Sequence, residues 1–324
     1  MANGAVELTA EAGVLRHFGA EYGAPDATQP VRVAISIGDR LPEGAVVDLT
    51  GGHKTVNWSV SLDQADSDPM HAMLAIRGRP RWFGLSLVQG FIVEPIISLA
   101  CVAGGQVLLP AAAIAEDGGA LLVIGRSRSG KSSVSARALA LGRQVLGDDQ
   151  VLVDARGVIG PFPRRLRVYD DLMDTSPMAV RALPPRVRFD LRVRRTVRIA
   201  TRGFVAPSLA LAHDAFGSIA KAGEIPLHRT VVVQRSAAAR ELTMDPIPLD
   251  IVLDEAVDIL VEQRRGLSQI RRDDWLTMLR SVADREAGLL DTALRGAPAY
   301  RVTVPEAWGA RLAVEKLAEA LDIR

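Results

Sequence analysis

The sequence contains a single cysteine, Cys101, among its 324 residues, so no disulfide can form within the chain. The apolar neighbours of Cys101 indicate a buried thiol in a reducing compartment. Aromatic residues are also scarce, at 4%, which is too few for a platform on which nucleic-acid bases stack. Neither sign of charge is in excess, because 39 basic residues face 38 acidic ones. Bulk charge therefore gives no reason to expect a nucleic acid or a bilayer as partner.

The N-terminus lacks the basic start and the apolar block of a signal peptide. Residues 95–115 contain no charge and match the length of a membrane span. However, Pro95, a glycine pair and Pro110 interrupt this stretch, so a buried helix, a turn and a strand explain it better. The helix is predicted from Trp82 to about Cys101, with a bend at Pro95. We therefore predict a cytoplasmic protein without a membrane segment.

The composition is that of a globular chain, with 48% hydrophobic and 24% charged residues, and the length fits one large domain or two modest ones. Short alternating runs at residues 31–37 and 55–62 predict strands. We therefore expect a small β-rich subdomain over residues 1–80. Farther along, residues 107–125 predict two strands joined by an Asp-Gly-Gly turn.

Residues 121–133 read LLVIGRSRSGKSS. An apolar run, a loop with two glycines five positions apart and a Gly-Lys-Ser ending match the phosphate-binding pattern GxxxxGK[ST] between a strand and a helix. The glycines let consecutive backbone N–H groups turn toward phosphate oxygens at the helix N-terminus. Lys131 can bridge the terminal phosphates, and the Ser132 hydroxyl can ligate Mg²⁺. The candidate nucleotide-binding residues are Gly125, Arg126, Ser127, Arg128, Ser129, Gly130, Lys131, Ser132 and Ser133.

A second motif, Gly147-Asp148-Asp149, interrupts the apolar run QVLGDDQVLV. Two adjacent carboxylates at the break of a strand cost free energy, so their presence suggests a function. Phosphoryl transfer to a hydroxyl needs a general base and a metal ligand, which two such acids could supply. Because side chains alternate along a strand, Asp148 and Asp149 should face different ways and divide these roles. An Asp-Asp turn that caps the strand is the structural alternative.

The stretch from Gly125 to Asp154 resembles the core of the HPr kinase/phosphorylase family. In that family a GKS phosphate loop, a helix and an apolar strand ending in Asp-Asp follow at this spacing, and weaker similarity covers about residues 80–324. The resemblance implies an α/β fold, the phosphoenolpyruvate-carboxykinase-like P-loop kinase core with a mixed β-sheet, over residues 81–324.

The resemblance also implies transfer that depends on ATP and Mg²⁺. Asp148 corresponds to the first Asp of the family pair, which acts as the base, and Asp149 to the second, which lies near the metal. Asp148 and Lys131 are therefore the candidate catalytic residues, and Ser132 and Asp149 are the candidate metal ligands.

The chain departs from the family pattern at three points. Ser133 stands where the full-length regulators usually have Glu after GKS, and Pro110-Ala111 stands where smaller relatives often have His-Ala. A downstream stretch rich in Glu and Gly is missing as well. These departures argue against phosphorylase activity and against HPr as the acceptor.

We therefore expect an ATP-dependent kinase that transfers the γ-phosphate to a hydroxyl, with a serine of a peptide or protein as the first candidate acceptor. The alternatives are a small-molecule kinase acting on an amino acid or polyol, an ATPase whose acceptor is water, and a catalytically degenerate nucleotide-binding regulatory module. We expect no nucleic-acid or membrane partner. A homo-oligomer stays open, because the related regulators assemble as hexamers.

Residues 181–202 carry eight arginines against one acid. The alternation in RVRFDLRVRR predicts a strand with Arg188, Arg192 and Arg194 on one face. Such a row of guanidinium groups suits phosphates or an acidic peptide, and a solvated strand face explains it equally well. Further candidates are Arg164, Arg165 and Arg167 for the transferring phosphate and Asp170, Asp171 and Asp174 as additional metal ligands.

Overall fold

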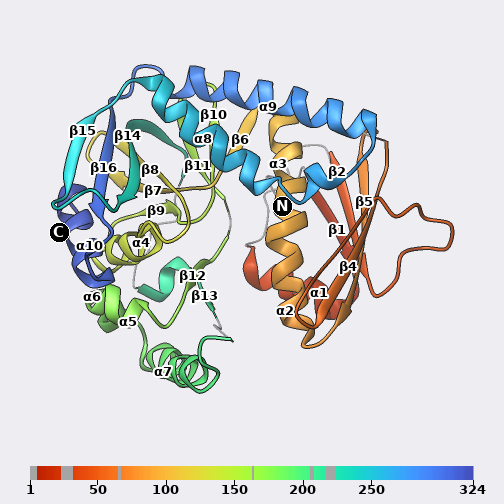
Figure 1. Ribbon diagram of the computed structural model, residues 1–324, viewed down its shortest axis with the longest axis horizontal. Coiled ribbons are helices and arrows are strands. Elements are labelled where there is room, and N and C mark those ends of the chain that lie inside the picture. The colour runs from red at the N-terminus through yellow and green to blue at the C-terminus, as the bar shows by residue number, and fades with distance from the viewer. Residues whose placement is uncertain are drawn as a thin grey trace. The chain divides into compact units, whose positions relative to one another are not determined.

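The computed structural model describes residues 6–22, 32–64, 67–162, 164–204, 208–216 and 223–323 (Figure 1). The protein is an α/β protein with mixed sheets. It divides into two compact units, Met1–Leu108 with Val257–Leu290 and Leu109–Ala256 with Asp291–Arg324. The first unit is larger than the subdomain predicted for residues 1–80, because it also takes in the long apolar helix and a segment from the C-terminal third of the chain.

The first unit contains a five-stranded sheet in the order β1-β2-β5-β4-β3. Its strands pair in parallel from β1 through β2 to β5 and antiparallel from β5 through β4 to β3. The alternating runs that predicted strands form β2 and β4, and the alternation buries one face of β2. The bounds are β1 Val6–Ala10, β2 Val33–Gly38, β3 Leu49–His53, β4 Val56–Leu62 and β5 Met70–Gly78, with helix α1 over Ala12–Glu21.

The long apolar helix is confirmed, with an irregular middle. It consists of α2 (Arg81–Val88), one π-helical turn (Gln89–Val93) and α3 (Glu94–Ala103). The prediction placed the irregularity at Pro95, and the wide turn lies just before it, because proline offers no N–H and its ring crowds the preceding turn. In the described residues one segment, Arg81–Ala103, is long and apolar enough to cross a membrane, but 78% of its most apolar window is buried inside the protein.

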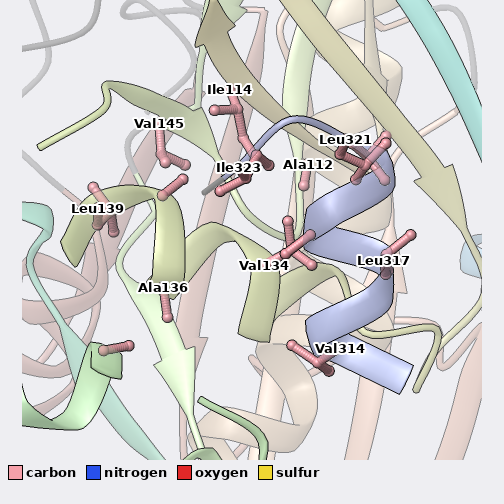
Figure 2. Packing of buried hydrophobic residues seen from close by; sticks show 14 of the residues in the cluster. Ala112, Ile114, Val134, Ala136, Leu139, Val145, Val314, Leu317, Leu321 and Ile323 are labelled. Atoms are coloured by element: carbon pink, nitrogen blue, oxygen red, sulfur yellow. The ribbon is translucent and has the colours of Figure 1, made fainter. Parts of the chain in front are cut away.

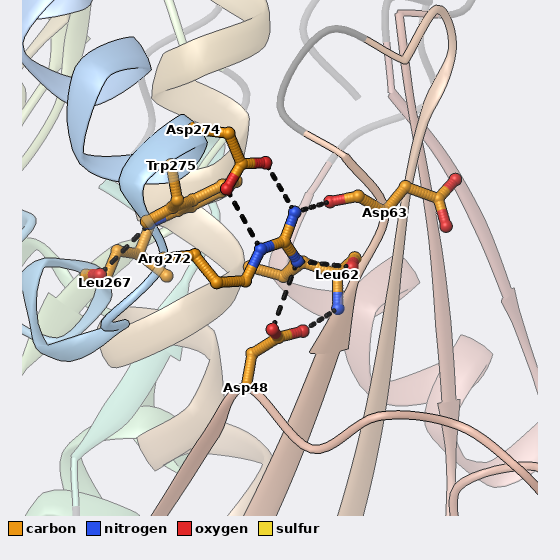
Figure 3. A network of polar contacts seen from close by, with 7 residues as sticks. All are labelled: Asp48, Leu62, Asp63, Leu267, Arg272, Asp274 and Trp275. Atoms are coloured by element: carbon orange, nitrogen blue, oxygen red, sulfur yellow. Dashed lines mark hydrogen bonds and ion pairs between the residues drawn. The ribbon is translucent and has the colours of Figure 1, made fainter.

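A partly buried polar network stabilises the first unit around Arg272 (Figure 3). Its guanidinium donates to Asp48 Oδ1 at 3.1 Å, to the carbonyl oxygens of Leu62 and Asp63 at 3.0 Å each, and to both carboxylate oxygens of Asp274 at 3.2 and 2.7 Å. The hydrogen bonds to Asp274, then those to Asp48, hold the pKa of Arg272 above its ordinary value. Asp48 also accepts from the Leu62 backbone N–H at 2.7 Å, so one arginine joins the sheet edge to the segment that precedes helix α9.

The second unit is built on a mixed sheet in which the neighbours run β10-β11-β14-β8-β7-β9, with β16 beside β14 and β15 beside β16. The hairpin predicted for residues 107–125 is confirmed by β7 (Ala111–Glu116) and β8 (Gly119–Gly125), which pair antiparallel around the Asp-Gly-Gly turn. The other strands of this unit are β9 Val145–Gly147, β10 Val151–Asp154, β11 Val158–Pro161, β14 Ile225–Ser236, β15 Thr243–Pro246 and β16 Ala299–Pro305, with β12 Leu166–Val168 paired to β13 Leu209–Leu211. Strand β6 (Gln106–Leu109) spans the chain boundary between the two units.

Helices α4 (Lys131–Ala140) and α10 (Ala310–Ala320) pack against each other, with α4 on β7 of this sheet and α10 on β16 (Figure 2). Val134 of α4 meets Val314 and Leu317 of α10, while Ile114 reaches the cluster from β7. All of these side chains are at most 4% exposed, so burial of apolar area fixes the start of α4 to the sheet. The remaining helices are α5 Leu172–Thr175, α6 Pro177–Ala182, α7 Pro185–Ala200, α8 Leu249–Gln263 and α9 Asp273–Leu294, with 3₁₀ turns at His213–Phe216 and Leu267–Gln269.

The strand predicted in RVRFDLRVRR is wrong, because residues 185–200 form helix α7. Pro185 at its first turn suits a helix start, since the N–H that proline lacks would have no partner there. The alternation of arginines with apolar residues does not distinguish a strand from a helix here, because arginine is a good helix former and positions four apart share a helix face as well as a strand face. Arg188 and Arg192 therefore lie one helical turn apart, rather than in a row along a strand.

Candidate active site

The loop that matched the phosphate-binding pattern joins the end of β8 to the start of α4. Arg128 and Gly130 both have left-handed backbones, with φ of 68° and 105°, and Gly130 is the residue directly before the helix. A side chain is strained at such angles, which explains the glycine. The first N–H groups of a helix lack intrahelical partners and favour an anion at its N-terminus. The loop can therefore bind phosphate by its backbone.

Lys131 is the first residue of α4, and its ammonium turns back onto the loop. Its Nζ donates to the carbonyl oxygens of Gly125 and Arg126, the latter at 3.2 Å. Burial lowers the pKa of Lys131, and the nearby carboxylates of Asp149 and Asp148 oppose this effect. The cation thus lies between the loop and the acidic pair, where a ligand phosphate would compete for it.

The acidic pair lies at the same edge of the sheet as the loop. Strand β7 pairs antiparallel with both β8 and β9, so β8 and β9 run in the same direction and their C-terminal ends share one edge. Asp148 and Asp149 follow directly after β9. Gly147 makes the turn possible, because a Cβ there would lie 2.2 Å from the carbonyl oxygen of Gln150.

The two acids face different ways, as predicted, but they lie in a bend directly after β9, which fits the alternative of an Asp-Asp turn better than alternation along a strand. Asp148 is 6% exposed, and its Oδ1 is buried without a hydrogen-bond partner among the described residues. Burial and the charge of Asp149 raise the pKa of Asp148 to about 7, while the hydroxyls of Ser132 and Ser135 and the charge of Lys131 act to lower it. A carboxyl group poised near neutral pH beside the loop lysine is suited to accept a proton.

Asp149 points outward, with 57% of its side chain exposed, and pairs with Arg164. Arg164 Nη1 donates to Asp149 Oδ2 at 2.6 Å, and the Arg164 side chain is only 8% exposed. Of the three arginines predicted to lie near a transferring phosphate, Arg164 therefore reaches the acidic pair. Arg165 is exposed and Arg167 is half-buried in β12.

The acids predicted as additional metal ligands have other partners. Asp170 accepts from Arg198 at 3.1 Å, and Asp174 accepts from Arg195 at 3.0 Å. Burial, followed by the charge of Asp170, raises the pKa of Asp171. Across the described ranges, no three His, Cys, Asp or Glu side chains gather as a metal site. These acids are thus not assembled around a metal, and any cation at the loop would take its remaining ligands from substrate and water.

Two contacts of the site went unpredicted. Ser135 lies three residues after Ser132, a spacing that puts both hydroxyls on one helix face, and both act on Asp148. Ser133 Oγ lies 2.9 Å from Thr175 Oγ1, which joins α4 to α5. The helical spacing signalled the first contact, but nothing local signals the second.

No protein-family model and no curated protein matches this chain.

Proposed function

We propose that this protein is a Mg²⁺- and ATP-dependent kinase that transfers the γ-phosphate to an alcohol hydroxyl. The fold we propose for its second unit is the phosphoenolpyruvate-carboxykinase-like P-loop core of the HPr kinase/phosphorylase family. The observation that carries the proposal is the placement of Asp148, whose pKa is raised to about 7 beside Ser132 and Lys131 at the edge where β8 and β9 both end. A phosphate site and a proton acceptor at one edge are what transfer to a hydroxyl requires.

The loop from Gly125 to Ser133 holds the nucleotide phosphates in this proposal. The backbone N–H groups at the start of α4 bind phosphate oxygens. Lys131 leaves the carbonyl oxygens of Gly125 and Arg126 and turns to the terminal phosphates. The exchange is favourable because a phosphate oxygen carries a full charge where a carbonyl oxygen carries a partial one.

The residues present fit a magnesium ion. The Ser132 hydroxyl at the start of α4 and the Asp149 carboxylate after β9 are hard oxygen ligands, and Mg²⁺ in kinases is held by one or two protein oxygens together with phosphates and water. When bound, the ion neutralises charge on the phosphates. Asp149 is half-exposed and can change partner from Arg164, which is then available to the transferring phosphate.

Asp148 acts as the general base. Its buried carboxylate takes the proton of the acceptor O–H as the acceptor oxygen bonds to the γ-phosphorus. The bond from that phosphorus to the β–γ bridging oxygen breaks, and ADP leaves with the electron pair. The neutral form of Asp148 is the one that burial favours, so proton transfer moves the side chain toward its preferred state.

A phosphate-transfer assay with labelled Mg·ATP tests this function, offering serine peptides, free serine, polyols and water in parallel. We expect labelling of one acceptor class by the wild type and a loss of at least about 100-fold in both Lys131→Ala and Asp148→Asn. Asp148→Asn should still bind a fluorescent ATP analogue. Lys316→Ala and Asp245→Asn change exposed residues of the same unit and should retain full activity. Transfer that survives Asp148→Asn would exclude Asp148 as the base.

The identity of the labelled acceptor distinguishes the alternative functions. Phosphate released to water alone would assign an ATPase, and labelling of free serine or a polyol would assign a small-molecule kinase. Binding of the ATP analogue with no labelled product under any condition would support a nucleotide-binding regulatory module instead.

A further inference from the structure

Helix α7 has an inner face that is fixed to the second unit by ion pairs. Arg195 Nη1 lies 3.0 Å from Asp174 Oδ1, and Arg198 Nη1 lies 3.1 Å from Asp170 Oδ1. Arg194 donates to the Ser208 carbonyl oxygen at 2.7 Å. Leu191 is the one buried residue of the helix. Figure 1 shows α7 beside α5 at one margin of this unit.

The outer face of α7 carries an apolar stripe open to solvent. Phe189, Val193 and Val197 are 64%, 45% and 37% exposed, and their spacing of four residues places them on one side of the helix. Most isolated exposed apolar residues need no explanation, but a continuous stripe on one helix face marks a surface that another molecule covers.

Arginines flank this stripe. Arg186 and Arg192 are exposed and Arg188 is half-buried, and none of the three forms an ion pair with a described residue. Helix α7 as a whole carries six arginines and one acid, whereas the entire chain has a formal net charge of +1. The local excess of positive charge favours a partner with carboxylates, since guanidinium groups pair with them in two-pronged geometry.

Helix α7 is coupled to the candidate active site through α5. Of the two partners of its inner arginines, Asp170 lies just before α5 and Asp174 lies within it, and Thr175 is the last residue of α5. Thr175 Oγ1 in turn lies 2.9 Å from Ser133 Oγ, directly after the phosphate loop. A molecule held on α7 is thus held by the elements that also position the start of α4.

We propose that the outer face of α7 docks an acidic segment of the acceptor protein or peptide, an inference that deepens the kinase function proposed above. Its apolar side chains would cover Phe189, Val193 and Val197, and its carboxylates would pair with Arg188 and Arg192. An anionic bilayer fits less well, because membrane-surface helices present a broad apolar face opposite their basic one. On α7 arginines are interspersed with the exposed apolar side chains, and the opposite face is already tied by ion pairs.

Fluorescence anisotropy of the full-length protein tests the docking surface. The probe is a fluorescein-labelled synthetic peptide with glutamates and leucines at helical spacing around one serine, and a matched peptide has lysine for glutamate. We expect the acidic peptide to bind, and its Kd to rise by about tenfold or more in Arg188→Glu/Arg192→Glu and in Phe189→Ser/Val193→Ser. Arg240→Glu and Leu312→Ser change exposed residues on other elements and should leave the Kd unchanged.

Each outcome of this experiment either supports or overturns the docking inference. Equal affinity in all variants, equal binding of the lysine peptide, or binding to phosphatidylglycerol vesicles in preference to the peptide would overturn the docking inference. Circular dichroism of each variant confirms that the helix is retained.

Lys131→Ala distinguishes the docking proposal from the kinase proposal, because it should abolish phosphate transfer and keep peptide affinity. Wild-type protein that binds the peptide but never binds the ATP analogue would contradict the kinase function, whereas transfer without peptide binding would contradict the docking alone.

Discussion

Arg164 Nη1 lies 2.6 Å from Asp149 Oδ2, so the acidic turn after β9 is neutralised by an arginine that is 8% exposed. This pair places a positive charge against the carboxylate that we propose for the metal. A cation that binds at Asp149 must therefore compete with Arg164. If the proposed function holds, nucleotide-free protein should bind Mg²⁺ weakly by itself, and Mg·ATP should release Arg164 from Asp149 toward a phosphate.

Arg164→Gln should tighten binding of Mg²⁺. Because Asp149 is more than half exposed, the ion pair is screened by solvent and contributes at most about 1 kcal/mol, or about fivefold in affinity. A magnesium titration of the fluorescent ATP analogue measures the effect, with Arg165→Gln, an exposed neighbour, as the matched control. Unchanged or weaker magnesium dependence in Arg164→Gln would contradict competition for Asp149.

Asp148→Asn should stabilise the protein at neutral pH. The pKa of Asp148 is raised to about 7, whereas that of an unfolded aspartate is about 4. Between these values the folded protein binds more protons than the unfolded chain, so the free energy of unfolding falls as the pH rises from about 4 to about 7. The amide has no charge to desolvate, and we expect a Tm about 2–6 °C above wild type at pH 8 and equal to it near pH 4.

Thermal unfolding followed by circular dichroism across this pH range provides the measurement. The exposed carboxylate change Asp245→Asn should leave the Tm of wild type unaltered throughout. If Asp148→Asn were equally destabilised at every pH, the Asp148 carboxylate would be required for the fold, and its burial would not lower the stability of the wild type.

Ser135→Ala should shift the pH profile of transfer. The Ser135 hydroxyl lowers the pKa of Asp148, and the base must be ionised to accept a proton. Without the hydroxyl, the rising limb of kcat/KM should move to higher pH, while the rate at alkaline pH stays the same. Ser176→Ala, which changes another buried serine of this unit, is the control. A loss of rate at every pH would indicate that Ser135 supports the fold of the site and leaves the base unaffected.

Local patterns in the sequence were sufficient to predict those parts of the site whose structure is determined by neighbouring residues. Gly130 and Lys131 identified the strand-loop-helix junction, because the backbone angle and the charge there are required within a few residues. The turn that holds Asp148 and Asp149 after β9 is equally local, and it was the alternative to alternation along a strand. The mixed sheet of the second unit was expected, although its identity with a particular P-loop fold remains a proposal.

The remainder depends on contacts between distant segments. The pair of Arg272 and Asp48 spans 224 positions, and nothing near either residue indicates its partner. The strand prediction for α7 failed for a different reason, since six arginines interleaved with apolar residues satisfy a strand and a helix alike. The ion pairs that fix the inner face of α7 come from Asp170, just before α5, and Asp174 within it.

Arg272→Met should destabilise the first unit strongly. The substitution leaves Asp48, whose side chain is 2% exposed, with a buried charge and without its cation, which costs about 3–5 kcal/mol. Denaturant unfolding of Arg272→Met, beside Arg271→Met at an exposed neighbour, measures this loss. The double variant Arg272→Met/Asp48→Asn should recover part of it, because the amide removes the buried charge and can still accept from the Leu62 N–H. A loss below about 1 kcal/mol, without recovery in the double variant, would show that water solvates Asp48 and that the network contributes no more than a surface pair.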